Sequence, residues 1–213
     1  MQEFTYDDSV FINIAFADDY KDLLYAAVFV ILDCGFIPRC ALEDFDSGQI
    51  RIDKILYLIK NSRYGIHDLS YLKLDPDSNL PRFNMPLELG IFIGAKHYGY
   101  GKQKNKEYLV LEKDKYRYQS FCSDISGQDI RAHDLKVDGV FRSIRNWLSR
   151  KRPEYRYPTW GKIAKRYREF TAELPSYSEA LSQDSKDLTF NDYSAIVSDW
   201  LKLNSWGGKS GND

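Results

Sequence analysis

Strand-like and helix-like segments alternate along this chain from residue 9 to about residue 150. Segment 9–16 is β-branched and aromatic, and the apolar residues that follow from Tyr20 recur at helical spacing as far as Gly35. The other strand-like segments are 36–42, 64–69, 107–111 and a weaker one at 121–125, and the other helical stripes are 52–59, 86–97 and 137–148. Such alternation is typical of parallel sheets, in which a helix connects each strand to the next. It predicts an α/β fold, a flavodoxin-like three-layer sandwich with a parallel sheet of about five strands.

Proline and charge replace this periodicity at 150–158, RKRPEYRYP, which indicates a boundary. Two further helices are expected beyond it, at about 159–173 and 190–203. We therefore expect three parts: an α/β domain at 1–150, a C-terminal helical extension at 151–204 and a disordered tail at 205–213.

The charges nearly cancel, with 30 Lys and Arg against 31 Asp and Glu, so bulk electrostatics does not favour a nucleic-acid coat protein. Eight basic side chains gather in 150–168, where nucleic acid would find a basic patch, but a charged helical face explains them better. Nucleic acid is therefore not the partner that we expect.

Three cysteines without CxxC spacing fit neither a zinc site nor a disulfide framework, and they are typical of reduced thiols in the cytosol. The first ten residues lack the features of a signal peptide, and the longest apolar run, 23–32, is too short to cross a bilayer. We expect a cytoplasmic protein without a membrane partner.

In a flavodoxin-like sheet, ligands bind at the carboxyl ends of the strands, near the switch point between the first and third strands. The side chains expected there are Asn13, Phe16, Glu43, Asp44, Asp68, Ser70, Arg82, Asn84 and Glu88. This set suits a small, polar ligand that contains a sugar. The sequence has no Gly-rich phosphate loop, no His or Cys pair at metal-ligand spacing and no GxSxG motif, so we expect neither a metal nor a cofactor.

Two motifs carry a resemblance to known families: IHDLS at 66–70 and RFNMPLELG at 82–90. They resemble the nucleoside 2-deoxyribosyltransferase superfamily and the related TIR-domain NAD glycohydrolases. Residues 9–150 are also similar to a group of uncharacterised bacterial proteins that we associate with the same fold. The resemblance implies cleavage of an N-glycosidic bond in a nucleotide or dinucleotide such as NAD. It places the family's glutamate at Glu88 and its base-contacting aspartate at Asp68.

The resemblance also implies a homo-oligomer, a role as a toxic effector in bacterial antiphage defence, and a partner protein encoded nearby. The chain departs from the transferases at Arg82, where they carry an acid six residues before the glutamate. A cation at this position suits a phosphorylated ligand better than a free deoxynucleoside.

The chemistry of the residues agrees with this reading. Cleavage of a C1′–N bond passes through an oxocarbenium-like transition state, which a carboxylate beneath the sugar stabilises. Glu88 is the candidate for that carboxylate, and Asp68 is the candidate acid for the leaving base, provided that burial raises its pKa. Asn13 and Ser70 would orient the ligand, and Phe16 would stack on the base.

The same residues also have simpler, purely structural interpretations. If Pro86 is the first residue of its helix, Glu88 occupies the third position, where a glutamate caps the helix. Asp68 then belongs to a turn, and Arg82 is a solvated loop residue. The corresponding function is a nucleotide-binding module without catalysis, or a self-assembling TIR-like signalling module. A response-regulator receiver is disfavoured because Asn13 stands where receivers carry an acidic pair.

Overall fold

The computed structural model describes residues 5–43, 48–74 and 77–206. It contains a five-stranded parallel sheet in the order β2-β1-β3-β4-β5. The strands are β1 (Ser9–Asn13), β2 (Ile37–Arg39), β3 (Tyr64–Asp68), β4 (Glu107–Glu112) and β5 (Arg131–Ala132). This strand order is that of a flavodoxin-like fold, so the predicted fold class is confirmed.

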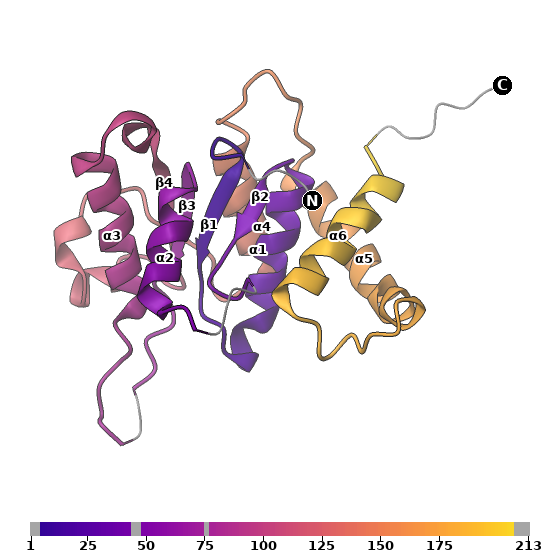
Figure 1. Cartoon of the computed structure of the whole chain (residues 1–213), viewed down its shortest axis with the longest axis horizontal. Helices are drawn as coiled ribbons and strands as arrows, with labels where there is room; N and C mark the ends of the chain where they lie inside the picture. The colour runs from indigo at the N-terminus through magenta and orange to yellow at the C-terminus, as the bar shows by residue number, and fades with distance from the viewer. Residues whose placement is uncertain (1–4, 44–47, 75–76, 207–213) are drawn as a thin grey trace.

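Helices cover both faces of the sheet (Figure 1). One face carries α2 (Arg51–Lys60) and α3 (Asn84–Tyr98), and the other carries α1 (Lys21–Asp33) and α4 (Val137–Leu148). The side chains of β1 alternate between these layers, because Val10 and Ile12 belong to the α1–α4 core and Phe11 belongs to the α2–α3 core.

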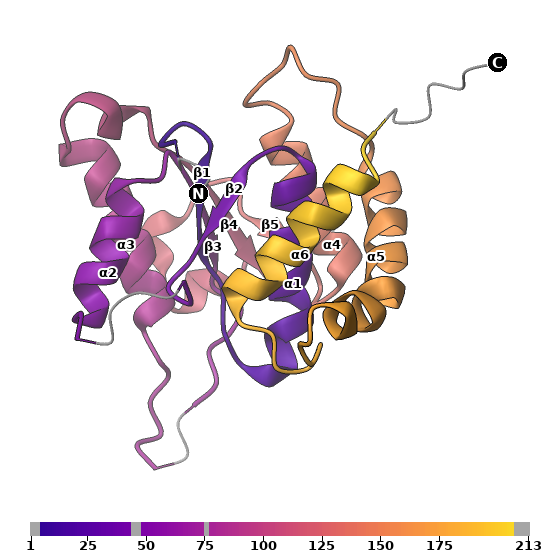
Figure 2. The same cartoon turned by 45° about the vertical axis from the view of Figure 1, so that its right-hand side comes forward.

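Two C-terminal helices, α5 (Trp160–Ala180) and α6 (Phe190–Leu203), pack outside α1 and α4 (Figure 2). The ring of Phe29 on α1 lies 5.5 Å from that of Phe170 and 6.1 Å from that of Trp200. These rings belong to the same buried cluster as the sheet residues. This packing explains why α1 is almost wholly apolar: both of its sides are covered.

Gly35 follows α1 with a φ of +73°, the left-handed conformation expected of a glycine that ends a helix. The strand predicted at 121–125 is wrong, because that segment contains a 3₁₀ turn at Ser123–Ile125. The fifth strand is β5 instead, whose two residues are too few to show a period of two. Most of the tail predicted to be disordered, residues 207–213, lies outside the described residues.

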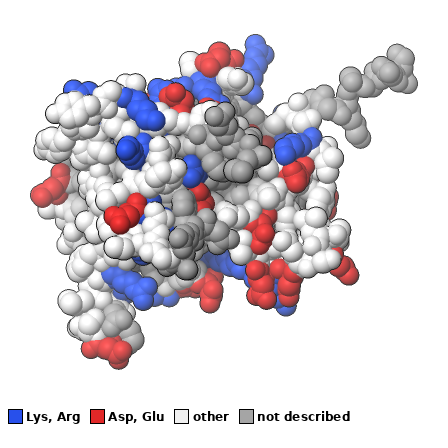
Figure 3. All heavy atoms as spheres, in the orientation of Figure 1, with Lys and Arg blue, Asp and Glu red and all other residues white. Residues whose placement is uncertain are grey.

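The loop between β3 and α3 extends away from the body of the molecule (Figure 1). A β-bridge between Leu74 and Pro81 draws its two sides together, and Leu80 and Phe83 are more than half exposed on it. Basic and acidic side chains are interspersed on the face shown in Figure 3, in keeping with the near-zero net charge. Among the described helices, none is long and apolar enough to span a membrane.

Candidate functional site

The end of β1 is tied to the beginning of α3. The side-chain amide of Asn13 donates to the carbonyl oxygen of Met85 at 2.9 Å and lies 3.1 Å from Nδ1 of His67. Burial, aided by the charge of Lys106, lowers the pKa of His67 to about 3, so the ring is neutral and can accept the bond from Asn13. Met85 lies in the first turn of α3, one turn before Glu88. The structure therefore brings Asn13 and the helix that carries Glu88 together, as the sequence predicts.

Glu88 is buried, with 4% of its surface exposed, and makes no hydrogen bond or ion pair within residues 5–43, 48–74 and 77–206. Burial raises the pKa of this carboxyl to about 7, against the opposing charge of Arg51 at the start of α2. A buried carboxyl without a partner is costly, and such groups are concentrated at functional sites.

The helix-capping reading of Glu88 is wrong. α3 begins at Asn84 with Phe83 as its cap residue, and its first turn contains no acid. Pro86 is therefore the third residue of the helix rather than the first, and Glu88 is the fifth. At that position, a glutamate cannot bond back to the cap backbone, which requires the third position.

Asp68 lies in a closed hydrogen-bond network. Its Oδ2 accepts from the hydroxyl of Tyr20 at 2.7 Å and from Nε2 of His133 at 3.1 Å. Its Oδ1 accepts from the backbone N–H of Ser70 at 2.9 Å and from the Ser70 hydroxyl. Nδ1 of His133 accepts from the backbone N–H of Leu135 at 3.1 Å, which leaves the proton of a neutral ring on Nε2. Both oxygens of Asp68 are thus fully used.

This network determines the charge of Asp68. Burial would raise its pKa, but the hydrogen bonds from His133, Ser70 and Tyr20 outweigh burial and lower it. The sequence-based condition for Asp68 as the acid that protonates a leaving base was a raised pKa. That role is therefore corrected: Asp68 is held as a carboxylate.

The other predicted residues are dispersed. Glu43 accepts three hydrogen bonds from the Arg39 guanidinium at 2.8–3.0 Å and one from the Cys40 backbone, so its carboxylate is committed to the fold. Phe16 is half-buried between the two cores, and Arg82 and Asn84 are exposed at the entrance to α3. Asp44 lies outside the described residues.

Sequence reasoning missed two members of the Asp68 network, Tyr20 and His133. They are 113 residues apart, and no spacing motif connects them. Only the topology could have indicated a role for His133, because this residue directly follows β5 and so lies at the same edge of the sheet as Asp68. No group of three or more His, Cys, Asp or Glu side chains that could hold a metal occurs among the described residues.

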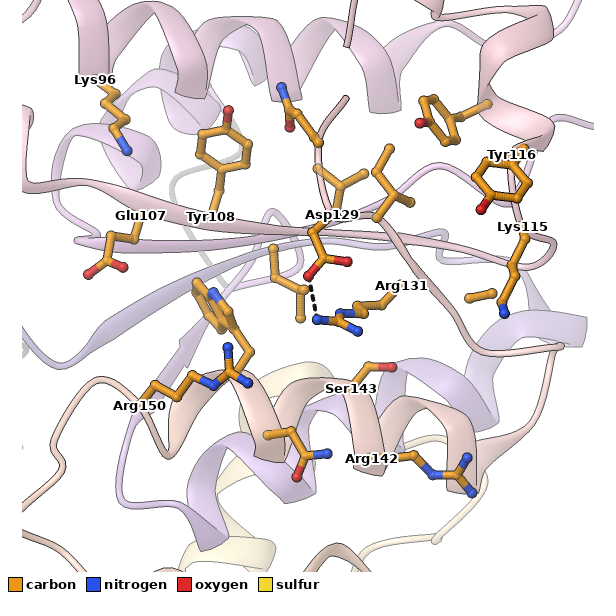
Figure 4. Close-up of a pocket in the computed structure, with 18 residues that line it drawn as sticks. Lys96, Glu107, Tyr108, Lys115, Tyr116, Asp129, Arg131, Arg142, Ser143 and Arg150 are labelled. Carbon is orange, nitrogen blue, oxygen red and sulfur yellow. Dashed lines mark hydrogen bonds and ion pairs between the residues drawn. The ribbon is translucent and has the colours of Figure 1, made fainter. Parts of the chain in front are cut away.

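A cleft of about 870 Å³ lies elsewhere, along the outer edge of β4 (Figure 4). It is lined by residues of β4, β5 and α4, by the segments that flank them and by Lys96 of α3, and none of the predicted site residues lines it. This cleft is therefore separate from the residues around Asp68 and Glu88.

The chain was also compared with known proteins. No protein-family profile, curated protein or solved structure matches it significantly.

Proposed function

We propose that the protein is a nucleotide N-glycosidase that cleaves NAD or a closely related dinucleotide, with Glu88 beside the ribose. The observation that carries this proposal is the buried Glu88 carboxyl, which has no partner among the described residues and a pKa of about 7. A group that titrates near neutral pH is suited to catalysis, because both of its protonation states are accessible.

Positive charge develops on the sugar when a C1′–N bond breaks. A carboxylate in a water-poor site stabilises such charge more strongly than one in water. Glu88 would act as this carboxylate, and Asn13 would keep α3 in place against β1. Arg51, whose charge reaches Glu88, is available for the phosphates of the ligand.

The state of Asp68 favours one substrate class. A neutral nucleoside needs its base protonated before it departs, and the locked Asp68 carboxylate has no proton to give. Nicotinamide in NAD is already a pyridinium cation. When its C1′–N bond breaks, the electron pair neutralises the ring nitrogen, and water adds to C1′ while the Glu88 carboxylate takes the proton of that water. This reaction requires no acid at the leaving group, and Asp68 then serves as a positioning residue.

The test is chromatographic product analysis. Purified protein is incubated with NAD, NADP, ATP and deoxynucleosides, beside the Glu88→Gln variant and a control, Glu179→Gln, at an exposed position of α5. We expect nicotinamide from the wild type and the control and none from Glu88→Gln. Equal release from all three proteins, or release of bases from deoxynucleosides alone, would refute the assignment.

The loop between β3 and α3 favours a second candidate, a self-assembling nucleotide-binding module. Four large apolar side chains that precede Glu88 in the sequence are 56–60% exposed. They are Leu74, Leu80 and Phe83 on this loop and Leu87 on α3. Apolar surface of this kind often marks an interface between copies. In that case, a dinucleotide should raise the unfolding temperature and the particle mass in light scattering without turnover, and Phe83→Ser should abolish the gain in mass. An effector role in antiphage defence stays a prediction, which toxicity on expression would test.

A further inference from the structure

The cleft at the outer edge of β4 is open because β5 is short. β5 pairs only with Leu111 and Glu112, the last two residues of β4, so the first half of β4 has no strand on its outer side among the described residues. The Glu107 N–H donates to Arg63, and the Leu111 carbonyl accepts from Leu69, both on the β3 side. Backbone groups alternate sides along a strand, so those of Tyr108 point outward into the cleft.

One face of α4 forms the opposite wall. The cleft is lined by Arg142, Ser143, Asn146 and Trp147 at the spacing of a single helical face, and by Arg150 in the turn that follows α4. Figure 4 shows Arg142, Ser143 and Arg150 along one side, Lys96 of α3 on the other side and Lys115 at one end. The cleft is therefore a trough that runs along β4 and α4.

The trough is positively charged. Lys96, Lys115, Arg142 and Arg150 line it, and none of the four makes an ion pair with a described residue. Its two acids are already neutralised, because Glu107 pairs with Lys151 and Asp129 with Arg131. Four cations without an ion-pair partner among the described residues thus line the trough, although the guanidinium of Arg142 also lies over the ring of Trp160 at 4.7 Å.

Of the four aromatic residues that line the trough, Tyr118 is buried and two have a cation over the ring, which leaves Tyr116 as the exposed ring available for stacking on a nucleobase. Lys96 lies over the ring of Tyr108 at 5.7 Å, and Lys151 lies over the ring of Trp147 at 4.7 Å. Single-stranded nucleic acid is bound by exposed aromatic faces together with basic side chains. The open backbone of Tyr108 suits a polypeptide instead, since an extended peptide can add to an unpaired strand edge.

We propose that this trough binds an extended acidic segment of a partner protein, which adds as a strand beside β4. Arg142 lies on α4 and Arg150 in the turn that directly follows it; eight residues at the rise of a helix span about 12 Å. An extended chain advances about 3.3 Å per residue, so carboxylates four residues apart match the two guanidinium groups. The segment therefore carries Asp or Glu at two positions separated by three residues.

The test uses two pools of short fluorescent peptides that differ only at those two positions, which hold glutamate in one pool and lysine in the other. Fluorescence anisotropy is measured with the full chain, with Arg142→Glu/Arg150→Glu, and with a matched control, Lys162→Glu/Lys165→Glu, on the exposed face of α5. The wild type and the control should bind the glutamate pool at least tenfold more tightly than the lysine pool, about 1.4 kcal/mol. The cleft variant should lose this preference.

Amide hydrogen exchange on the wild type provides a second measurement. Strand addition should slow exchange of the Tyr108 N–H when the glutamate pool is bound, whereas attraction between surface charges alone would leave it unchanged. Three results would overturn the proposal: equal binding of the two pools, a preference that survives in the cleft variant, or an unprotected Tyr108 amide. A single-stranded oligonucleotide that binds more tightly than the peptides, and loses binding in the cleft variant, would also overturn it.

Discussion

Replacing Glu88 with glutamine should make the protein more stable in alkaline solution and change it little in acid. Burial raises the pKa of Glu88 from 4.5 to about 7, and each pKa unit corresponds to about 1.4 kcal/mol. Above pH 7, burying the ionised carboxyl therefore costs about 3 kcal/mol of folding free energy. Glutamine has nearly the same shape and no charge, so it avoids this cost.

The sign follows from proton binding. Between pH 4.5 and 7, the native state holds the Glu88 proton more tightly than the unfolded state does. The free energy of unfolding of the wild type therefore falls as pH rises through this window. Below the window both states are protonated, and the difference between wild type and variant disappears.

Urea unfolding of both proteins at pH 5 and at pH 8.5 measures the effect. The stability advantage of Glu88→Gln should grow by about 2–3 kcal/mol between these two values. Other titrating groups, such as His67 with its pKa lowered to about 3, are common to both proteins and cancel. The exposed control Glu179→Gln should show no change with pH. An advantage of equal size at both pH values, or a variant that is less stable at pH 8.5, would refute the reasoning.

Three further outcomes are expected. If Glu88 must be ionised for catalysis, kcat/KM for NAD should rise with pH and level off near pH 7, and Glu88→Gln should lose about 100-fold or more, measured by nicotinamide release. Lys106 is fully buried, and its pKa is lowered to about 7. The free energy of unfolding of the wild type, measured in urea, should therefore rise between pH 7 and 10 relative to that of Lys106→Met. The same pH dependence in both proteins would contradict this. Trp200→Ala should lower the free energy of unfolding by about 3–5 kcal/mol. Because Trp200 shares its core with α1, calorimetry of this variant should still show one unfolding transition. A separate transition at lower temperature would indicate that the C-terminal helices unfold independently.

Long, periodic elements were predictable from the sequence. β1 and β3 are buried along their whole length, as expected of strands in the middle of a parallel sheet, whereas α4 buries apolar residues at helical spacing, and its predicted bounds agree with the structure. β5 was missed because Arg131 and Ala132 are held only by pairing with β4, which the local sequence does not encode. Short edge strands depend on tertiary contacts in this way.

The candidate site was predictable in position and less so in chemistry. Topology alone places Asn13 and Asp68 at one edge of the sheet, and it does so correctly. The charge of Asp68 depends on Tyr20 and His133, which approach it only in the folded chain. The burial of Glu88 depends likewise on how α2 and the sheet enclose α3. Protonation states follow from such enclosure and cannot be derived from residue spacing.

A cationic ligand should relieve the cost of ionising Glu88, and this can be tested without catalysis. A carbocyclic analogue of NAD keeps the pyridinium charge but cannot form the oxocarbenium ion, and its reduced form has a neutral ring. The charged form attracts an ionised Glu88, so its affinity relative to the reduced form should increase between pH 6 and pH 8, across the Glu88 pKa of about 7. Titration calorimetry gives both affinities. In Glu88→Gln, the ratio of the two should not depend on pH. A ratio that is flat in the wild type would mean that the pyridinium does not lie beside Glu88, and the proposed substrate geometry would be wrong.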